Sequence, residues 1–258
     1  MTTTNAPGRQ VIAPAQWGPA PRSDVSSASA VTAMFRMLGS YAAADPSPLG
    51  ALRAVSTVAA HALPGVDCAS ITRLRNTTFE TIASTDEAAV RADALQYARR
   101  QGPCVDAVGP RRLARTHDLA SDPRWPQFGP AAVSLGMRSV LSLRVTDDDD
   151  VVVGLNLYSH RIGTFEDHTR DAAQLLAIHA AMIVAARVAR AQADNLHVAL
   201  ASSREIGIAV GVLMTTGKVT RDDAFDLLRG ASQHAHRKLR DIAAEVAETG
   251  ALEFVDRR

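Results

Sequence analysis

The feature that most restricts the fold is a long segment free of glycine and proline, which runs from His168 to Ile206 and stops at Gly207. Glycine and proline are the residues that most often interrupt a helix. Thr164 and Asp167 precede the segment and are residues of the kind that cap a helix start. The segment therefore predicts one helix that exceeds an ordinary globular helix in length and outruns what one face of a sheet can cover.

Small and apolar residues repeat along this helix at alternating spacings of four and three, the spacing of a coiled-coil seam. The seam consists of Leu175, His179, Met182, Ala186, Ala189, Ala193, Leu196 and Leu200. Two interpretations stay open: a parallel dimeric coiled coil, whose alanines let two backbones approach closely, and a single helix lying on its own sheet. Alanine and histidine bury less apolar area than leucine, at about 25 cal/mol per Å², so a dimer would need further contacts from the preceding domain.

The residues before the long helix predict an α+β domain with an antiparallel sheet. Apolar residues at helical spacing indicate helices at 31–38 and 49–63, which Pro46 and Pro48 separate. Alternating, β-branched residues predict two strand pairs with a helix at 88–100 between them. The pairs are 67–75 with 79–83, and 140–145 with 151–158 across the acidic turn 146–150.

The residues after the long segment predict a small three-helix module, because three apolar stripes at helical spacing can form one core. The stripes are Ile206, Val210 and Leu213; Ala224, Leu227, Leu228 and Ala231; and Leu239, Ile242, Ala243 and Val246. Thr220 and Gly250 suit the start of the second helix and the end of the third. The break before the third helix is crowded with basic side chains, namely His234, His236, Arg237, Lys238 and Arg240.

Composition sets the remaining limits. The chain has 258 residues, is 47% hydrophobic and has a formal net charge of +1, so nucleic-acid binding would require a local basic patch. No run of eighteen apolar residues and no signal-peptide pattern occurs, and we expect a cytoplasmic protein without a membrane partner. Residues 1–29 are rich in Pro, Ser, Thr and Ala and are expected to be a disordered tail. Cys68 and Cys104 are expected to be free thiols.

The three-helix module resembles the ANTAR domain, the RNA-binding module of bacterial transcription antiterminators. The resemblance rests on residues 211–214 (Gly-Val-Leu-Met), 224–229 (Ala-Phe-Asp-Leu-Leu-Arg), 232–233 (Ser-Gln) and 237–243 (Arg-Lys-Leu-Arg-Asp-Ile-Ala). It implies a homodimer whose two modules each bind the loop of an RNA stem-loop in a nascent transcript, with no DNA partner.

The same resemblance implies a set of RNA contacts around the junction of the second and third helices. These are Arg229, Ser232, Gln233, His236, Arg237 and Lys238, with Arg204 and Lys218 as outlying phosphate contacts. Two positions depart from many family members: Val210 stands where they have lysine, and His236 where they have asparagine. Residues 203–258 are formally neutral, so RNA binding should be modest in affinity and strongly dependent on salt.

Residues 31 to about 190 resemble a GAF domain of the type fused to ANTAR modules. The local strings are 101–107 (Gln-Gly-Pro-Cys-Val-Asp-Ala) and 118–126 (Asp-Leu-Ala-Ser-Asp-Pro-Arg-Trp-Pro). GAF domains commonly hold a small molecule between the sheet and the variable middle segment. Candidate pocket residues are Tyr97, Cys104, Asp106, His117, Trp125, Phe128 and Tyr158, although Trp125 and Phe128 can equally pack a loop onto the sheet.

The identity of a ligand or cofactor stays unknown, because the residues diagnostic of known GAF ligands are missing. No Cys-His pair offers a bilin attachment site, the cyclic-nucleotide pattern is absent, and isolated histidines such as His117, His160 and His168 predict no metal or haem site. Some GAF domains reduce free methionine sulfoxide with two thiols, so Cys68 and Cys104 could form such a pair or be buried structural thiols.

Together these patterns predict a non-enzymatic regulator that senses a signal and controls transcription antitermination. The expected divisions are a tail at 1–29, a GAF sensor domain at 30–168, a linking and dimerisation helix at 169–203, an ANTAR domain at 204–250 and a C-terminal tail at 251–258. The alternatives are a ligand-binding or partner-binding signalling scaffold without RNA binding, and a thiol-dependent reductase.

Overall fold

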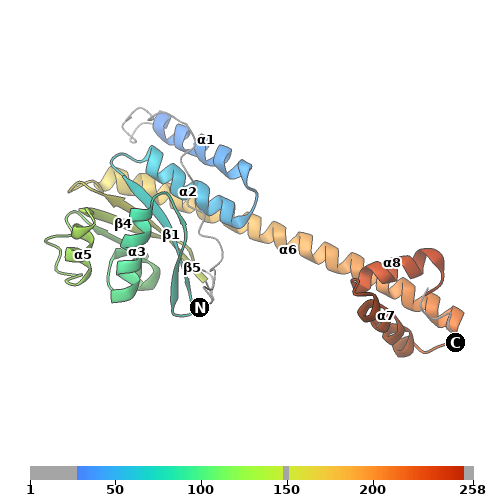
Figure 1. Cartoon of the computed structure of the whole chain (residues 1–258). Helices are drawn as coiled ribbons and strands as arrows, with labels where there is room; N and C mark the ends of the chain where they lie inside the picture. Colours follow the sequence, from blue (N-terminus) through green and yellow to red (C-terminus); the bar gives the residue numbers. More distant parts are fainter. Residues whose placement is uncertain (1–27, 148–150, 253–258) are drawn as a thin grey trace. The chain divides into compact units, whose positions relative to one another are not determined.

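The computed structural model describes residues 28–147 and 151–252, and the chain divides into two compact units after Val188 (Figure 1). Residues 1–27 of the expected tail, 148–150 of the expected acidic turn and 253–258 of the expected C-terminal tail lie outside the described residues. The first helix, α1, begins at Ala28 and therefore includes the last two residues of the expected tail.

The first unit contains a five-stranded antiparallel sheet in the order β2-β1-β5-β4-β3. Its strands are β1 (Cys68–Arg75), β2 (Thr78–Ser84), β3 (Leu113–Thr116), β4 (Ser139–Asp147) and β5 (Val151–Ser159). Both predicted strand pairs are present, and they meet where β1 pairs with β5, for example Ile71 opposite Leu155. The short edge strand β3 was not predicted, because four residues carry too little alternation to stand out from a loop.

Helices cover both faces of this sheet (Figure 1). One face packs against α1 (Ala28–Ala44), α2 (Pro48–Ala62) and the beginning of the long helix α6 (Asp167–Gly217). The other face packs against α3 (Glu87–Arg99) and α5 (Phe128–Ser134). It also packs against α4 (Pro103–Asp106) and the π-helical turn η1 (Ala107–Arg111), which follows α4 directly. The first unit is therefore a three-layer α+β domain.

The two faces differ in chemistry because side chains alternate along each strand. On β5, Leu155 and Leu157 belong to the apolar core beneath α1, α2 and α6, whereas Asn156 and Tyr158 lie on the other face. On β1, Ile71 lies in the same apolar core and Thr72 on the polar face. Polar side chains from two adjacent strands thus meet beneath α3.

The connection between α1 and α2 is fixed by hydrogen bonds. The Ser47 hydroxyl accepts a bond of 2.9 Å from the backbone N–H of Gly50 and so caps α2. Arg187 of α6 donates to the carbonyl oxygens of Asp45 at 2.6 Å and Ser47 at 2.8 Å, and also to that of Ala42. Arg187 therefore ties the last turn of α6 within the first unit to this connection.

The long helix was predicted, but it does not stop at Gly207: α6 is continuous from Asp167 to Gly217 and includes the expected first helix of the three-helix module. The residues that face the sheet core are Ala173, Leu176, Ala180 and Val184, which are offset from the predicted seam. Three seam residues, Leu175, Met182 and Leu196, are between 42% and 63% exposed. The seam is therefore not the face with which α6 lies on its own sheet.

By length and composition alone, α6 could cross a membrane, and a third of its most apolar eighteen-residue window is buried. Six residues between Ala172 and Val184 belong to the core of the first unit, and Ala209, Val210 and Leu213 belong to the core of the second. Those core contacts account for much of the apolar character of the helix at both ends.

The second unit is a three-helix module made of the end of α6, α7 (Arg221–Ala235) and α8 (Leu239–Thr249). Its core contains the predicted stripes, with Leu213, Leu228, Ile242 and Val246 at most 6% exposed. Leu227 is the exception: it was assigned to the second stripe but is 36% exposed. It lies about 100° around α7 from Leu228, beyond the arc that the other two helices cover.

Thr220 and Gly250 set the start of α7 and the end of α8, as predicted. The hydroxyl of Thr220 accepts a hydrogen bond of 3.3 Å from the backbone N–H of Asp223 and caps α7. Gly250 ends α8 with a φ of 76°, a conformation that glycine adopts without strain.

Candidate functional site

The connection between α7 and α8 gathers most of the predicted RNA contacts in one tight turn. His236 ends α7 with a φ of 51°, and the next backbone N–H, that of Arg237, donates to the carbonyl of Ser232 at 3.2 Å. The Ser232 hydroxyl donates back to the carbonyl of Arg237 at 2.6 Å. These bonds hold the side chains of Gln233, His236 and Lys238 on the exposed surface of the turn.

The basic side chains of this surface differ in their pairing. The guanidinium of Arg237 lies 2.7 Å from the carboxylate of Glu245, and that of Arg229 lies 2.8 Å from Asp226. Exposed pairs of this kind contribute about 0–1 kcal/mol, so a phosphate can compete for the cation. Lys238 has no ion pair within residues 28–147 and 151–252.

The outlying contacts Arg204 and Lys218 do not belong to the turn between α7 and α8. Arg204 lies exposed on α6, and Lys218 follows the end of that helix with a φ of 50°. Arg221, which was not among the predicted contacts, is exposed at the first position of α7 and has no ion pair in the described part of the chain. A basic residue directly after the Thr220 cap is the sequence signal that could have marked it.

A buried polar network occupies the space between the sheet and α3 in the first unit. At its centre is the carboxyl group of Asp93, which accepts hydrogen bonds from the Tyr158 hydroxyl at 2.5 Å and the Asn156 amide at 3.0 Å. Its second oxygen accepts from the Thr81 hydroxyl at 2.8 Å. Asp93, Asn156 and Tyr158 are all 0% exposed.

Three of the predicted pocket residues belong to this network: Tyr158, which contacts Asp93, and Tyr97 and Cys104, which extend it. The hydroxyls of Tyr97 and Thr72 lie 2.7 Å apart, and the Cys104 thiol donates to the Thr72 hydroxyl at 3.2 Å. Gln96 joins the two ends of the network: its amide donates to the Tyr158 hydroxyl at 2.8 Å, and its carbonyl accepts from the backbone N–H of Cys104 at 2.7 Å.

Burial dominates the ionisation of these groups. It raises the pKa of Asp93 despite the opposing effect of the hydrogen bonds that the carboxylate accepts. It also raises the pKa of Tyr158 well above its usual value, and that of the Cys104 thiol to about 12. The pKa of Cys68, on the same face of the sheet, is likewise raised to about 12.

The other predicted pocket residues lie elsewhere. Trp125 and Phe128 are buried in the apolar cluster that also contains the ring of Tyr158, which is the packing role that the sequence left open. Asp106 is half-buried and lies 3.6 Å from the guanidinium of Arg111. His117 is exposed, and its backbone carbonyl accepts a hydrogen bond from the N–H of Gly163 at 2.9 Å.

Sequence reasoning missed Asp93, Gln96, Thr72 and Asn156. The available signal was that Asp93 and Gln96 occupy inward positions on a helix whose other buried residues are alanines. Two buried polar atoms beneath α3 and in the sheet, Asn156 Oδ1 and Ser142 Oγ, have no hydrogen-bond partner. Within residues 28–147 and 151–252, no three His, Cys, Asp or Glu side chains are grouped to hold a metal ion.

The comparison with protein families decides the identity of both units. The profile of the GAF domain matches residues 49–185, which is more than half of the chain, and that of the ANTAR domain matches residues 194–246. The chain belongs to the GAF domain family and carries an ANTAR domain. A search among curated proteins found no match.

Solved structures resemble the GAF domain at low sequence identity. A LuxR-family transcription factor from Burkholderia cenocepacia, described as dependent on N-acylhomoserine lactone, is 17% identical with a TM-score of 0.50 and covers 62% of this chain and 98% of its own. The phytochrome photosensory core of Stigmatella aurantiaca is 14% identical with a TM-score of 0.50 and covers 79% of this chain and 44% of its own. At such identities the likeness shows the fold alone.

The two family assignments show in which domain each of the two sites lies. The network lies in the GAF domain, between the sheet and α3, and the turn between α7 and α8 lies in the ANTAR domain. GAF and ANTAR domains are regulatory domains, and ANTAR domains bind RNA. The remaining gap between the two family matches is residues 186–193, which is far shorter than the roughly 20 residues of a membrane-spanning helix.

Proposed function

We propose that this protein is a cytoplasmic regulator of transcription antitermination that binds RNA stem-loops through its ANTAR domain under the control of its GAF domain. The observation that carries the proposal is the order of the two domains in one chain, with an exposed, partly unpaired basic surface on the ANTAR domain. Unpaired loop bases can be read by short polar groups and by stacking, while arginine and lysine bind the phosphates.

The RNA contacts in this proposal are Arg229, Ser232, Gln233, His236, Arg237 and Lys238 around the turn, with Arg204 and Lys218 at a distance. Arg229 and Arg237 each exchange a carboxylate partner for a phosphate. Because the ANTAR domain has no overall positive charge, long-range attraction contributes little and the contacts act at close range. Each phosphate contact releases counterions from the RNA, so the affinity should fall steeply as the salt concentration rises.

A two-arm titration tests the contact surface. RNA with two stem-loops and randomised loops is first selected on the wild-type protein, and its binding is then measured at several salt concentrations for Arg237→Ala/Lys238→Ala. The expected result is weaker binding with a salt dependence lower by about one phosphate contact for each residue removed. Arg36→Ala/Arg91→Ala removes the same charge from exposed sites outside the surface and outside the seam, and serves as the matched control. Equal affinity of the two double variants would contradict the proposed surface.

The proposal also includes a homodimer formed through the seam of α6. Residues 189–201 are all exposed, among them Leu196 at 61% and Leu200 at 59%. A helix segment with such side chains gains stability when a second copy covers them. Leu196→Asp/Leu200→Asp should therefore yield a monomer in light scattering. Ala201→Asp, on another face of the helix, is the control and should leave the dimer intact.

A signal in the GAF domain would reach the RNA-binding surface through this helix pair, if ligand binding favours one register of the pair over another. A proline at Ala189 interrupts the helix between the two domains. It should uncouple them, and unchanged dimerisation together with unchanged RNA binding would remove α6 as the transmitter.

Two other functions are weighed against this one. A signalling scaffold without RNA binding is favoured by the formal neutrality of the ANTAR domain, and RNA crosslinking in cells separates it from the main proposal.

A thiol-dependent reductase needs a nucleophilic thiolate. Burial raises the pKa of both Cys68 and Cys104 to about 12, which opposes this function, and no methionine sulfoxide reduction above background is expected.

A further inference from the structure

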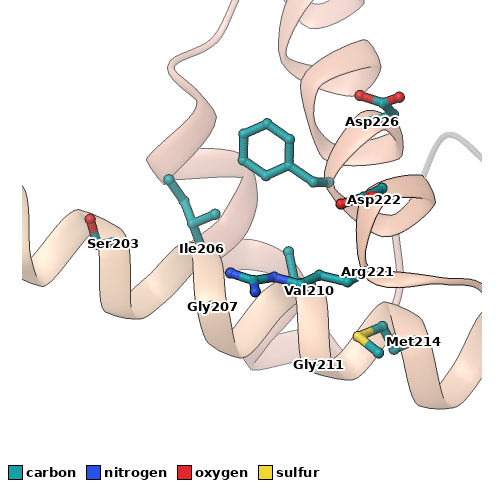
Figure 2. Close-up of a pocket in the computed structure, with 10 residues that line it drawn as sticks. Ser203, Ile206, Gly207, Val210, Gly211, Met214, Arg221, Asp222 and Asp226 are labelled. Carbon is teal, nitrogen blue, oxygen red and sulfur yellow. The ribbon is translucent and has the colours of Figure 1, made fainter.

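The ANTAR domain has a groove on its outer surface between α6 and α7 (Figure 2). Its volume is about 750 Å³. All lining residues lie between positions 203 and 226, so the groove belongs to a single compact unit. On the α6 side they are Ser203, Ile206, Gly207, Val210, Gly211 and Met214, and on the α7 side Arg221, Asp222, Phe225 and Asp226.

The floor of the groove is formed partly by glycines and is accessible to planar groups. Gly207 and Gly211 lie one turn apart on α6, and a Cβ atom built on either of them would meet nothing within 4 Å. The backbone of α6 is therefore accessible at two successive turns, beside the apolar side chains of Val210 and Met214. A planar ring can approach such a surface more closely than it can approach a helix that carries side chains at every position.

An aromatic ring and unused polar groups form the wall. The side chain of Phe225 lines the groove and remains 39% exposed, although α6, α7 and α8 pack together in this domain. Arg221 and Asp222 have no ion pair within residues 28–147 and 151–252, and Figure 2 shows the Arg221 side chain extending beside Val210 toward α6. A guanidinium offers donors only and a carboxylate acceptors only, so the wall can serve both kinds of hydrogen-bonding group on one ligand.

The groove adjoins the proposed RNA contacts. Asp222 and Asp226 are four positions apart on α7, as are Phe225 and Arg229, and Asp222 and Phe225 are three apart, so the four residues share one face of that helix. Asp226 lies in the groove and is paired with Arg229 at 2.8 Å. A phosphate bound to Arg229 would therefore lie next to Asp226, a residue that lines the groove.

The charges of the groove favour a nucleobase over a second copy of the chain. An apolar helix inserted into the groove would bury the carboxylate of Asp222 without a partner, which is strongly unfavourable. A base with an exocyclic amino group supplies the N–H donors that a carboxylate accepts, and aromatic side chains stack with any base.

We propose that this groove receives one unpaired base of the RNA loop, a base that carries an exocyclic amino group. Phe225 stacks on the base, Asp222 accepts from its amino group, and Arg221 binds its acceptor edge or the adjacent phosphate. The inference rests on the proposed RNA-binding function and names the ligand subsite within it. It adds Arg221, Asp222 and Phe225 to the contacts that the sequence predicted.

The test fills the groove without harming the fold. In the full chain, Gly207→Leu places a side chain in open space on a helix, where leucine is intrinsically more favourable than glycine. The variant should melt no lower than wild type and keep its oligomeric state, while its affinity for the RNA pool selected on wild type falls about tenfold or more. Ala201→Leu adds comparable bulk to an exposed position of α6 outside the groove and should bind as wild type does.

A second variant separates base reading from charge. Asp222→Ala removes both the negative charge and the hydrogen-bond acceptor. If Asp222 only repels phosphates, this variant should bind every RNA more tightly; if Asp222 accepts from an amino group, binding to the selected loops should weaken. Unchanged RNA affinity of Gly207→Leu, or a change in its oligomeric state alone, would overturn the inference while leaving the RNA-binding function in place. Failure of the wild-type protein to select any RNA would remove both.

Discussion

Asp93 offers the sharpest test of the buried network in the GAF domain. The residue is completely buried, and burial raises the pKa of its carboxyl group even though three side chains donate hydrogen bonds to it. Asp93→Asn keeps the shape of the side chain and an oxygen that can accept from Tyr158, but it cannot ionise. The variant therefore isolates the contribution of the charge.

The direction of the effect follows from proton linkage. A carboxyl group whose pKa is higher in the folded state than in the unfolded state contributes stability that is fully present below the unfolded pKa of about 3.8 and is lost as the pH rises toward the folded pKa. Across that window the free energy of unfolding of the wild type should fall by up to about 1.4 kcal/mol per pH unit relative to the variant. Asp93→Asn should thus become relatively more stable as the pH rises from 4.

Urea unfolding between about pH 4 and pH 8 measures this difference. Trp125 is 2% exposed and lies in the same apolar cluster as the ring of Tyr158, so its fluorescence reports unfolding of the GAF domain. The chain has one further tryptophan, Trp17, and Trp17→Phe in both proteins removes its signal. A difference that stays constant with pH, or that changes in the opposite direction, would refute the raised pKa of Asp93.

Three further predictions concern the fold. Cys68 and Cys104, whose pKa values are raised to about 12, should not react with a thiol reagent at pH 8 in the folded protein, and both should react in urea; rapid labelling of the folded protein would contradict their burial. Gly50→Ala should destabilise the GAF domain by about 1–3 kcal/mol in thermal unfolding, because its Cβ would lie 2.4 Å from the carbonyl oxygen of Asp45; an unchanged Tm would show that this connection relaxes freely. Thr220→Ala should cost the ANTAR domain about 1 kcal/mol through loss of the α7 cap, while Thr220→Ser should restore most of it.

The sequence by itself determined the elements and the two family assignments. Alternation of side chains located the long strands, helical spacing located the three ANTAR helices, and the absence of glycine and proline located α6, because each of these patterns is local. Short elements such as β3 and α4, with four residues each, carry too little periodicity to be recognised. The core positions of the ANTAR domain followed for the same reason, except Leu227, whose place on α7 depends on how the neighbouring helices pack.

Only the tertiary structure decided which side chains meet. Asp93 is more than sixty positions along the chain from Asn156 and Tyr158, and it meets them because α3 packs over β1 and its neighbour β5. Nothing in the sequence near Asp93 reveals the partners that keep its carboxyl group buried. The groove of the ANTAR domain is of the same kind, since its glycines and its phenylalanine become one surface only when α6 and α7 pack together. Helices and strands follow from local spacing, whereas sites follow from contacts between distant segments.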